Sequence, residues 1–347
     1  MAGAEKEKRL EEKGDPESLR RQGGAALREV TRKKLMVFSG TAHPALGEEV
    51  ATGLGVTLGP VDVSRFSNGE IYVRFLESVR GVDAFVIQTC AEPVNDSIME
   101  LLLLMDALKR ASAKRITAVM PYYGYSRQDK KTLAREPISA RLVAEIITAA
   151  GADRVLSVDL HAGQIQGFFD FPFDHITALP LLASHIAQKN LPDLVVVSPD
   201  AGRVKVAKKL ADRLHTPMAI MHKRRPDKNM AEMLHVIGDV DGRTAILIDD
   251  MVDTGGTLVE AAAALKRDGA REIYACATHA IISGNAVERI EGSEIKELVV
   301  TNTLPVPPEK KIGKITVLSI APMLADTVMA VFKEESVSEI VGGDNQI

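Results

Sequence analysis

From Lys34 onward, short apolar runs alternate with longer stretches in which apolar residues recur at helical spacing. The short runs predict strands at Leu35–Phe38, Ile71–Phe75, Ala84–Gln88, Ile116–Met120, Val155–Asp159, Leu194–Val197, Met218–Met221, Ala245–Ile248 and Ile273–Ala277. The longer stretches predict helices at Ser97–Ala111, Ser139–Ala150, Val204–Leu214 and Leu258–Arg267. Most of the strands are apolar throughout, which is typical of strands that helices cover on both faces. The pattern therefore predicts an α/β fold with mostly parallel sheets flanked by helices.

Local signals mark the ends of several predicted helices. Ser97 and Glu100 have the spacing of a capping box at a helix start. Gly269 follows the last predicted helix, where a left-handed residue commonly ends the helix. The glycines between Gly53 and Gly59 do not match the dinucleotide-binding fingerprint, so we interpret them as a helix end and a turn.

The order of elements is similar in the two halves of the chain. Residues 38–44 lead into a helix, as residues 197–203 do, and in each half a strand and a polar segment follow that helix. A length of 347 residues also suggests about two domains. We predict two similar domains, at residues 35–176 and 177–341.

The chain ends differ from the rest of the sequence. Residues 1–34 hold ten Lys or Arg and seven Asp or Glu but few bulky apolar residues, which predicts a flexible N-terminal extension. A partner-binding arm is the alternative. We expect residues 342–347 to form a frayed tail.

Composition and charge narrow the class of protein. Hydrophobic residues make up 46% of the chain and charged residues 26%, as in ordinary globular proteins. The net charge of −4 provides no strong field toward nucleic acid or an anionic membrane, so we expect neither partner. Cys90 and Cys276 lie in apolar runs and are expected to be buried, reduced thiols. The apolar run Leu101–Met105 is far shorter than a membrane span of about 20 residues, and we expect a cytoplasmic protein.

An acidic, glycine-containing loop opens the helix predicted after strand Ala245–Ile248. The strand is followed by Asp249 and Asp250, and the loop consists of Asp253, Thr254, Gly255, Gly256 and Thr257. The N–H groups of a helix N-terminus bind phosphate, and glycines let the phosphate approach the backbone. Asp249 and Asp250 would repel phosphate but accept hydrogen bonds from sugar hydroxyls. The loop therefore predicts a sugar-phosphate site, suited to ribose 5-phosphate; an acidic strand end with an Asp helix cap is the alternative.

Residues 245–257 resemble the ribose-5-phosphate motif of the type I phosphoribosyltransferase fold. Together with Phe66–Glu70, Tyr122–Lys131, Asp159–Asp170 and His222–Pro226, they resemble the phosphoribosyl-pyrophosphate synthetase family, nearest its phosphate-activated bacterial type. The resemblance runs from about Leu35 to Ser338. It implies two type I-like domains and transfer of the diphosphoryl group of MgATP to the C1 hydroxyl of ribose 5-phosphate, giving phosphoribosyl pyrophosphate and AMP for nucleotide biosynthesis. Asp249 and Asp250 would then bind the ribose hydroxyls, and the loop 253–257 the 5-phosphate.

The same resemblance implies how ATP and Mg²⁺ would bind. Phe66 would stack on adenine while Asn68 and Glu70 read its edge, and the start of this segment would come from a neighbouring subunit. Arg127, Gln128 and Asp129 would approach the nucleotide from the first domain. His161 and Asp200 would lie at Mg²⁺; Asp200 suits this oxygen-preferring ion, whereas the contact of His161 is left open as direct or water-mediated. From its chemistry alone, His161 would be interpreted as a core histidine at a strand end.

Two further segments would act on the transferred group. Lys223 and Arg225 resemble a catalytic pair on a flexible loop that closes on ATP. The pyrophosphate loop would be Asp200, Ala201, Gly202 and Arg203, although the family usually has Gly where Arg203 stands. We expect this arginine either to clash with the pyrophosphate or to add a phosphate contact.

Regulation and assembly are less clear from the sequence. Gln166, Ser336, Val337 and Ser338 match positions of the family's regulatory site for phosphate and ADP, but Gly163 and Glu339 depart from its pattern, which leaves phosphate activation and ADP inhibition open. The shared ATP site implies a homo-oligomer, a hexamer in relatives. Two alternatives to the enzyme are a non-catalytic regulatory relative and a type I phosphoribosyltransferase.

Overall fold

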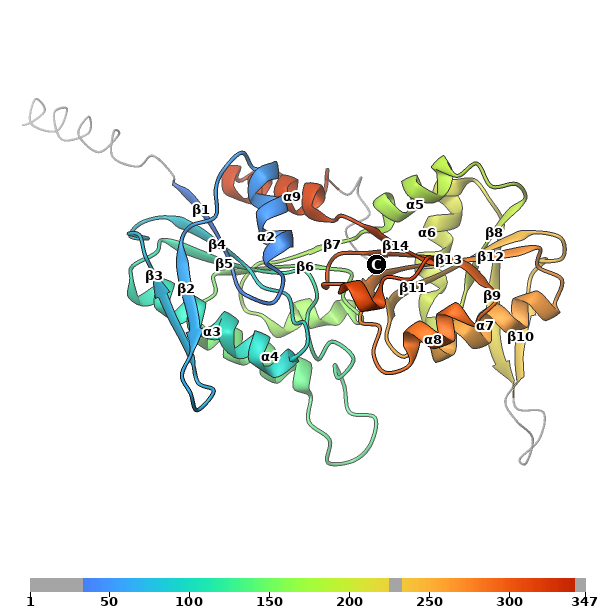
Figure 1. The fold of residues 1–347 in the computed structure, drawn as a ribbon, viewed down its shortest axis with the longest axis horizontal. Helices are drawn as coiled ribbons and strands as arrows, with labels where there is room; N and C mark the ends of the chain where they lie inside the picture. The colour runs from blue at the N-terminus through green and yellow to red at the C-terminus, as the bar shows by residue number, and fades with distance from the viewer. Residues whose placement is uncertain (1–33, 225–232, 341–347) are drawn as a thin grey trace, which may run out of the picture. The chain divides into compact units, whose positions relative to one another are not determined.

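The computed structural model describes residues 34–224 and 233–340, which form two sheets with helices on both faces (Figure 1). The first sheet is parallel throughout and has the order β1 (Leu35–Ser39), β4 (Asp83–Ile87), β5 (Arg115–Met120), β6 (Arg154–Val158) and β7 (Phe173–Ile176). Strands β2 (Val61–Arg65) and β3 (Ile71–Phe75) form a separate antiparallel hairpin. The helices of this half are α2 (Pro44–Gly53), α3 (Val94–Arg110) and α4 (Ser139–Ala150), with a 3₁₀ turn η1 at Gly163–Phe168.

The second sheet is parallel except at its edge strand β10. Its order is β10 (Met233–Ile237), β9 (Met218–Arg224), β8 (Leu194–Ser198), β11 (Thr244–Val252), β12 (Glu272–Ala280), β13 (Ile295–Thr301) and β14 (Ile315–Leu318). The remaining helices are α5 (Leu179–Gln188), α6 (Val204–Leu214), α7 (Gly256–Arg267), α8 (Ala286–Glu291) and α9 (Ala321–Lys333), and 3₁₀ turns η2 and η3 lie at Ala201–Arg203 and Pro308–Lys310. This architecture confirms the α/β prediction.

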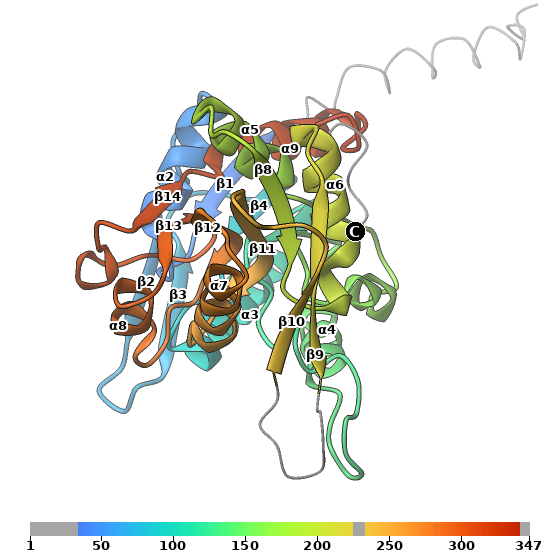
Figure 2. The same ribbon diagram turned by 90° about the vertical axis from the view of Figure 1, so that its right-hand side faces the viewer.

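Alternation along the strands sends side chains into two cores in each half. In β11, Ala245 and Leu247 pack on the α7 side, whereas Ile246 and Ile248 pack on the side of α5 and α6 (Figure 2). In the first sheet, α3 and α4 cover one face. The other face is covered by α2 together with α9, although α9 follows the second sheet in the chain.

The predicted domain boundaries remain a prediction. Each sheet is built from one predicted range, but α9 packs against α2 of the first half, and the described residues from Leu35 onward form one compact unit. Apart from Lys34, the expected N-terminal extension lies outside the described residues, as does the expected tail at 342–347. In the described ranges, no helix has the length and apolar character that a membrane crossing needs.

All the strands and helices predicted by position are present. Strands β9, β11 and β12 are longer than predicted, and β11 runs through Asp249 and Asp250 because it stays paired with β12 as far as Val252. Strands β2, β7, β10, β13 and β14 were not predicted. They are short or carry charged residues, so their apolar signal is weak.

The capping-box prediction for the helix at Ser97 is wrong. Helix α3 begins three residues earlier, after Pro93, and Ser97 Oγ donates to the carbonyl oxygen of Ala91 at 2.8 Å. The Glu100 carboxylate is buried and accepts hydrogen bonds from Thr41.

Other local predictions are confirmed. Gly269 has φ +93° just after α7, and its N–H and that of Ala270 donate to carbonyl oxygens of the last helical turn. Gly55 ends α2 in the same way, with φ +69°. Cys90 and Cys276 are free and buried, and burial raises the pKa of each thiol to about 12.

Candidate functional site

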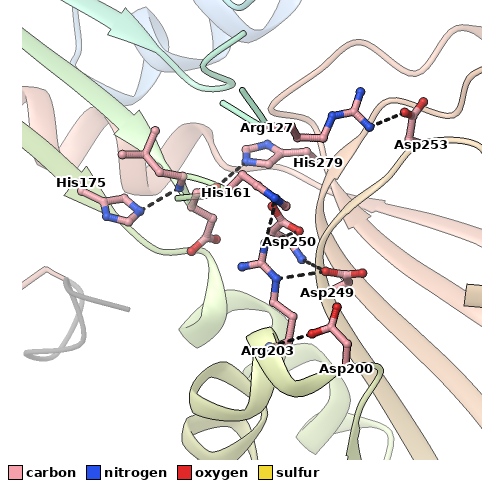
Figure 3. A network of polar contacts seen from close by, with 11 residues as sticks. Arg127, His161, His175, Asp200, Arg203, Asp249, Asp250, Asp253 and His279 are labelled. Carbon is pink, nitrogen blue, oxygen red and sulfur yellow. Dashed lines mark hydrogen bonds and ion pairs between the residues drawn. The ribbon is translucent and has the colours of Figure 1, made fainter. Parts of the chain in front are cut away.

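Polar residues from the two sheets meet where parallel strands end. Asp159 and His161 follow β6, Asp200 follows β8, and Asp249, Asp250 and Asp253 lie at the end of β11 (Figure 3). Since ligands of α/β proteins bind outside the carboxyl ends of parallel strands, this is the expected place for a site.

The loop after β11 leads directly into the N-terminus of α7, as the sequence predicts. Gly255 is the cap residue with φ +72°, and no side chain caps the first N–H groups of the helix. The Asp253 carboxylate accepts from Ser283 Oγ at 2.5 Å and pairs with Arg127 at 2.6 Å. Arg289 donates to the carbonyl oxygen of Thr254 at 3.2 Å. The loop is therefore held by Arg127, Ser283 and Arg289, and among the described residues no side-chain cap is found at the N-terminus of α7.

Arg203 lies against the two carboxylates at the end of β11. Its Nε is 3.2 Å from Asp249 Oδ1, and its Nη2 is 2.6 Å from Asp250 Oδ1. Burial and the neighbouring Asp250 carboxyl raise the pKa of Asp249 to about 8. Burial also favours the neutral form of Asp250, but its hydrogen bond with His161 and the charge of Arg203 lower its pKa. The surroundings of these two adjacent acids thus shift their pKa values in opposite directions.

Asp250 also fixes the ring of His161. Asp250 Oδ2 lies 2.8 Å from His161 Nδ1. The carboxylate can only accept from Nδ1, whereas the Arg203 guanidinium can only donate to it, so Nδ1 lies between an acceptor and a donor. Figure 3 shows His161, Asp250 and Arg203 side by side, with Arg203 Nη2 3.0 Å from His161 Nδ1.

The short turn η2 carries the segment from Asp200 to Arg203. Asp200 Oδ1 accepts from the backbone N–H of Arg203 at 3.0 Å, which caps the turn. Asp200, Ala201 and Gly202 are exposed, whereas the Arg203 side chain points inward to the carboxylates. Arg203 thus contacts protein carboxylates here, and neither a clash nor a phosphate contact is visible in the protein alone.

Within the described ranges, no cluster of three or more His, Cys, Asp or Glu side chains could hold a metal ion by itself. Mg²⁺ is usually held by one or two carboxylates together with substrate phosphates. The exposed Asp200 carboxylate and the Nε2 atom of His161 are candidate donors for such a shared site.

Of the three residues predicted to approach ATP after β5, one points to the loop at residues 253–257. Arg127 pairs with Asp253. Gln128 Oε1 accepts from Ser139 Oγ at 2.7 Å at the start of α4, and Asp129 accepts a hydrogen bond from Gln164. These two side chains therefore also stabilise the local fold.

Phe66, Asn68 and Glu70 lie in the turn of the β2–β3 hairpin. The Phe66 ring is 56% exposed and has an edge-on contact with Tyr72. Among the described residues, the hydrogen bonds of residues 66–70 stay within the hairpin. Asn68 Oδ1, for example, accepts from the N–H of Glu70 at 3.2 Å. The described residues of one chain therefore do not join this turn to Arg127 by a hydrogen bond or ion pair.

The predicted catalytic pair is only partly visible. Lys223 belongs to β9, where its backbone pairs with Leu234 of β10. Its side chain, and the whole of Arg225, lie outside the described residues.

Three of the four predicted regulatory residues line one cavity of about 390 Å³. Gln166, Val337 and Ser338 are in its wall, and Ser336 is not. The cavity also contains two arginines that were not predicted from the sequence, Arg115 and Arg154, which pair with Asp83 and Asp174.

Two buried histidines were not predicted either: His175 in strand β7 and His279 in strand β12. A single charged residue or histidine in an apolar run does not indicate which distant residue will form its hydrogen bond or ion pair in the folded protein.

Comparison with known proteins identifies the family. Residues 35–151 match the N-terminal domain of ribose phosphate pyrophosphokinase, and residues 226–341 match the phosphoribosyl synthetase-associated domain. A ribose-phosphate pyrophosphokinase of Oceanobacillus iheyensis is 55% identical over 88% of this chain and 96% of its own length. One from Bacillus subtilis is 54% identical over the same shares of the two chains. A phosphoribosylpyrophosphate synthetase structure from Mycobacterium smegmatis is 52% identical and superposes with a TM-score of 0.83, covering 87% of this chain and 100% of that one. This chain therefore belongs to the ribose-phosphate pyrophosphokinase family.

Proposed function

We propose that this chain performs the reaction of its family with the residues at the ends of β6, β8 and β11. The enzyme transfers the diphosphoryl group of ATP to the C1 hydroxyl of ribose 5-phosphate, giving 5-phosphoribosyl 1-pyrophosphate and AMP. The single observation that carries the assignment of residues is the uncapped N-terminus of α7 directly beside Asp249 and Asp250.

The ribose 5-phosphate site would consist of two parts. The loop Asp253 to Thr257 would bind the 5-phosphate through the N–H groups of α7 and the hydroxyls of Thr254 and Thr257. Asp249 and Asp250 would accept hydrogen bonds from the ribose hydroxyls. Arg203 supports this arrangement because it brings a positive charge to both carboxylates.

Mg²⁺ would neutralise the charge on the ATP phosphates and so make phosphorus open to attack. Asp200 and His161 Nε2 would hold this ion, with His161 either in direct contact or acting through water. The segment from Asp200 to Arg203 would lie along the transferred pyrophosphate, and the exposed backbone of Ala201 and Gly202 permits a close approach.

The ATP site would be completed by a second copy of the chain. Arg127, Gln128 and Asp129 would contact the nucleotide in one subunit, while Phe66, Asn68 and Glu70 would come from a neighbour. The exposed Phe66 ring and the separation of its turn from Arg127 in one chain support a shared site. We propose a homo-oligomer, with a hexamer as the expected form.

Lys223 and Arg225 would stabilise the charge on the transferred phosphoryl oxygens. Fixed cations in this role are worth on the order of 10³ to 10⁵ in rate. Lys223 lies near the end of β9, where its backbone pairs with Leu234 of β10, and Arg225 lies outside the described residues. Their role on a loop that closes on ATP rests on the family resemblance.

The shared site and the lid can be tested together. We expect Lys223→Ala to lower kcat by about 10³, roughly 4 kcal/mol, with little change in ribose 5-phosphate affinity. Phe66→Ala should weaken ATP binding. When the two variants are dissociated, mixed and reassembled, part of the activity should return, because some sites then combine Lys223 of one subunit with Phe66 of another.

The matched control mixes Lys223→Ala with Arg225→Ala, two changes on the same loop that cannot complement each other. AMP formation from MgATP and ribose 5-phosphate is the readout. Equal activity in the two mixtures would contradict the shared site, and near-normal turnover of Lys223→Ala alone would remove the lid role.

Regulation would use the cavity lined by Gln166, Val337 and Ser338. Ser336 directly precedes Val337 in the sequence but does not line the cavity. Its two arginines support an anionic ligand such as phosphate or ADP, although both already pair with carboxylates. The cytoplasmic location expected from the sequence stays a prediction.

A further inference from the structure

The peptide bond between Asp159 and Leu160 lies in an unusual turn. Asp159 has φ +38°, a left-handed conformation that residues other than glycine rarely adopt. The turn comes directly after β6 and directly before His161. A conformation of this kind persists only where its surroundings hold it.

Two buried histidines hold the two ends of this peptide group. The Leu160 N–H donates to His175 Nε2 at 2.9 Å, and His279 Nε2 lies 3.0 Å from the Asp159 carbonyl oxygen. His175 comes from β7 of the first sheet and His279 from β12 of the second (Figure 3). We call these two residues the histidine clamp.

The partners of the clamp fix the tautomer of each ring. A backbone N–H can only donate, so His175 Nε2 accepts and its Nδ1 carries the proton. A carbonyl oxygen can only accept, so His279 donates from Nε2, and its Nδ1 is left to accept from Thr303 Oγ1 at 2.9 Å. Burial lowers the pKa of both histidines, which keeps the rings neutral. The two rings are therefore in opposite tautomers.

The side chain of Asp159 is held as well. Its Oδ2 accepts from the N–H of Ala178 at 2.9 Å and from Thr278 Oγ1 at 2.6 Å. Ala178 directly precedes α5 and Thr278 belongs to β12, so two segments far apart in the chain donate to this residue.

Opposite tautomers select one orientation of the peptide group. If the peptide flipped, its carbonyl oxygen would face the lone pair of His175 Nε2, and its N–H would face the N–H of His279. Both hydrogen bonds would be lost in a buried environment, where unpaired polar groups are costly. The clamp therefore specifies the direction in which the chain continues to His161.

We propose that His175 and His279 are positioning residues that orient His161 toward Asp250 and the reacting phosphates. This inference rests on the proposed role of His161 at Mg²⁺. In this role the two histidines act through the peptide group between Asp159 and Leu160, and His175 also lines the cavity of about 390 Å³ described above.

Kinetics of paired substitutions test the proposal. His175→Leu and His279→Leu remove the hydrogen bonds, whereas His175→Gln keeps an acceptor and His279→Gln keeps a donor near the original Nε2 position. We expect kcat to fall by about 10- to 100-fold in the leucine variants, as displaced catalytic groups do, with KM for ribose 5-phosphate changed less than threefold. The glutamine variants should recover most of kcat.

The control is His43→Leu. His43 Nδ1 also accepts a backbone N–H, that of Leu46, but at the start of α2. A loss of kcat in His43→Leu as large as in the clamp variants, or no recovery with glutamine, would overturn the proposal.

Solid-state ¹⁵N NMR of the histidine-labelled full-length enzyme provides a readout independent of turnover. We expect a proton on Nδ1 of His175 and on Nε2 of His279, with each signal assigned by its loss in the leucine variant. The same tautomer for both rings would overturn the clamp. Opposite tautomers with unchanged kcat in the leucine variants would overturn the positioning role and leave the activity of the family untouched.

Discussion

Arg203 shows what a single residue contributes to the site. It stands where the resemblance leads one to expect glycine, and its guanidinium meets both Asp249 and Asp250. Its side chain is 13% exposed, so little solvent screens these contacts. The sequence identifies the residue as unusual, but the direction of its side chain depends on the η2 turn and on the Asp200 cap, which sequence spacing does not specify.

Replacing this charge should weaken sugar binding. In Arg203→Gln, the two carboxylates lose their counter-charge, take up a proton more readily and become poorer acceptors for ribose hydroxyls. We expect ribose 5-phosphate to bind about 10- to 100-fold more weakly by calorimetry, as for loss of roughly 1.5–3 kcal/mol. Lys205→Gln, an exposed charge two residues away, is the control. Tighter binding in Arg203→Gln would mean that the arginine competes with the sugar.

At the scale of elements, the sequence was most informative where a long apolar signal and a turn signal agree. Strand β11 and helix α7 were both predicted, and so was the glycine that ends α7. The start of α3 was misjudged because Ser97 Oγ bonds upstream to the Ala91 carbonyl instead of capping the helix. Propensity and spacing describe one segment at a time, and such a contact depends on where the preceding residues fold.

The N-terminus of α7 can be tested with two glycines of similar conformation. Gly255 has φ +72° in the loop at residues 253–257, and Gly242 has φ +67° in the turn before β11. An added Cβ has no contact within 3.4 Å at either position, so neither alanine should clash with its surroundings. Each variant should lose about 1–2 kcal/mol of its free energy of unfolding through backbone strain alone. Only Gly255→Ala should also weaken ribose 5-phosphate binding, by about tenfold or more, since it moves the N–H groups of the first turn.

Urea unfolding and calorimetry measure the two effects separately. Equal binding by Gly242→Ala and Gly255→Ala would contradict the assignment of the 5-phosphate to this loop.

At the scale of the whole molecule, the site depends on contacts between residues far apart in the chain. Asp253 meets Arg127, Asp250 meets His161, and Asp159 meets His279. The sequence singled out the segments that carry Arg127, His161, Asp250 and Asp253, because each has its own motif. It could not predict the buried histidines, since each lies singly in its strand and meets a peptide group that follows a different strand, β6.

These buried histidines should make stability fall in mild acid. Burial lowers the pKa of His175 and His279 in the folded protein, so below pH about 6.5 the unfolded chain binds more protons than the folded one. Their contribution is full above pH 6.5 and is lost as pH falls toward the folded pKa values. Each histidine should contribute a slope of up to about 1.4 kcal/mol per pH unit.

Comparison with His175→Gln isolates one of these titrations. Asp249 acts in the opposite sense, since its raised pKa of about 8 makes stability fall as pH rises toward 8, but it is present in both proteins and cancels. The free energy of urea unfolding, followed by circular dichroism between pH 7.5 and 5, should fall less steeply in the variant. Parallel curves for the two proteins would contradict a buried neutral His175.

The position of α9 has a consequence for how the protein is made. Ile320, Leu324 and Val328 are fully buried against Leu46 and Val50 of α2 and one face of the first sheet. These residues are synthesised after the whole second sheet. Until then, the face of the first sheet beside α2 lacks the apolar side chains that complete its core, and exposed apolar surface of this kind makes a nascent domain prone to aggregation.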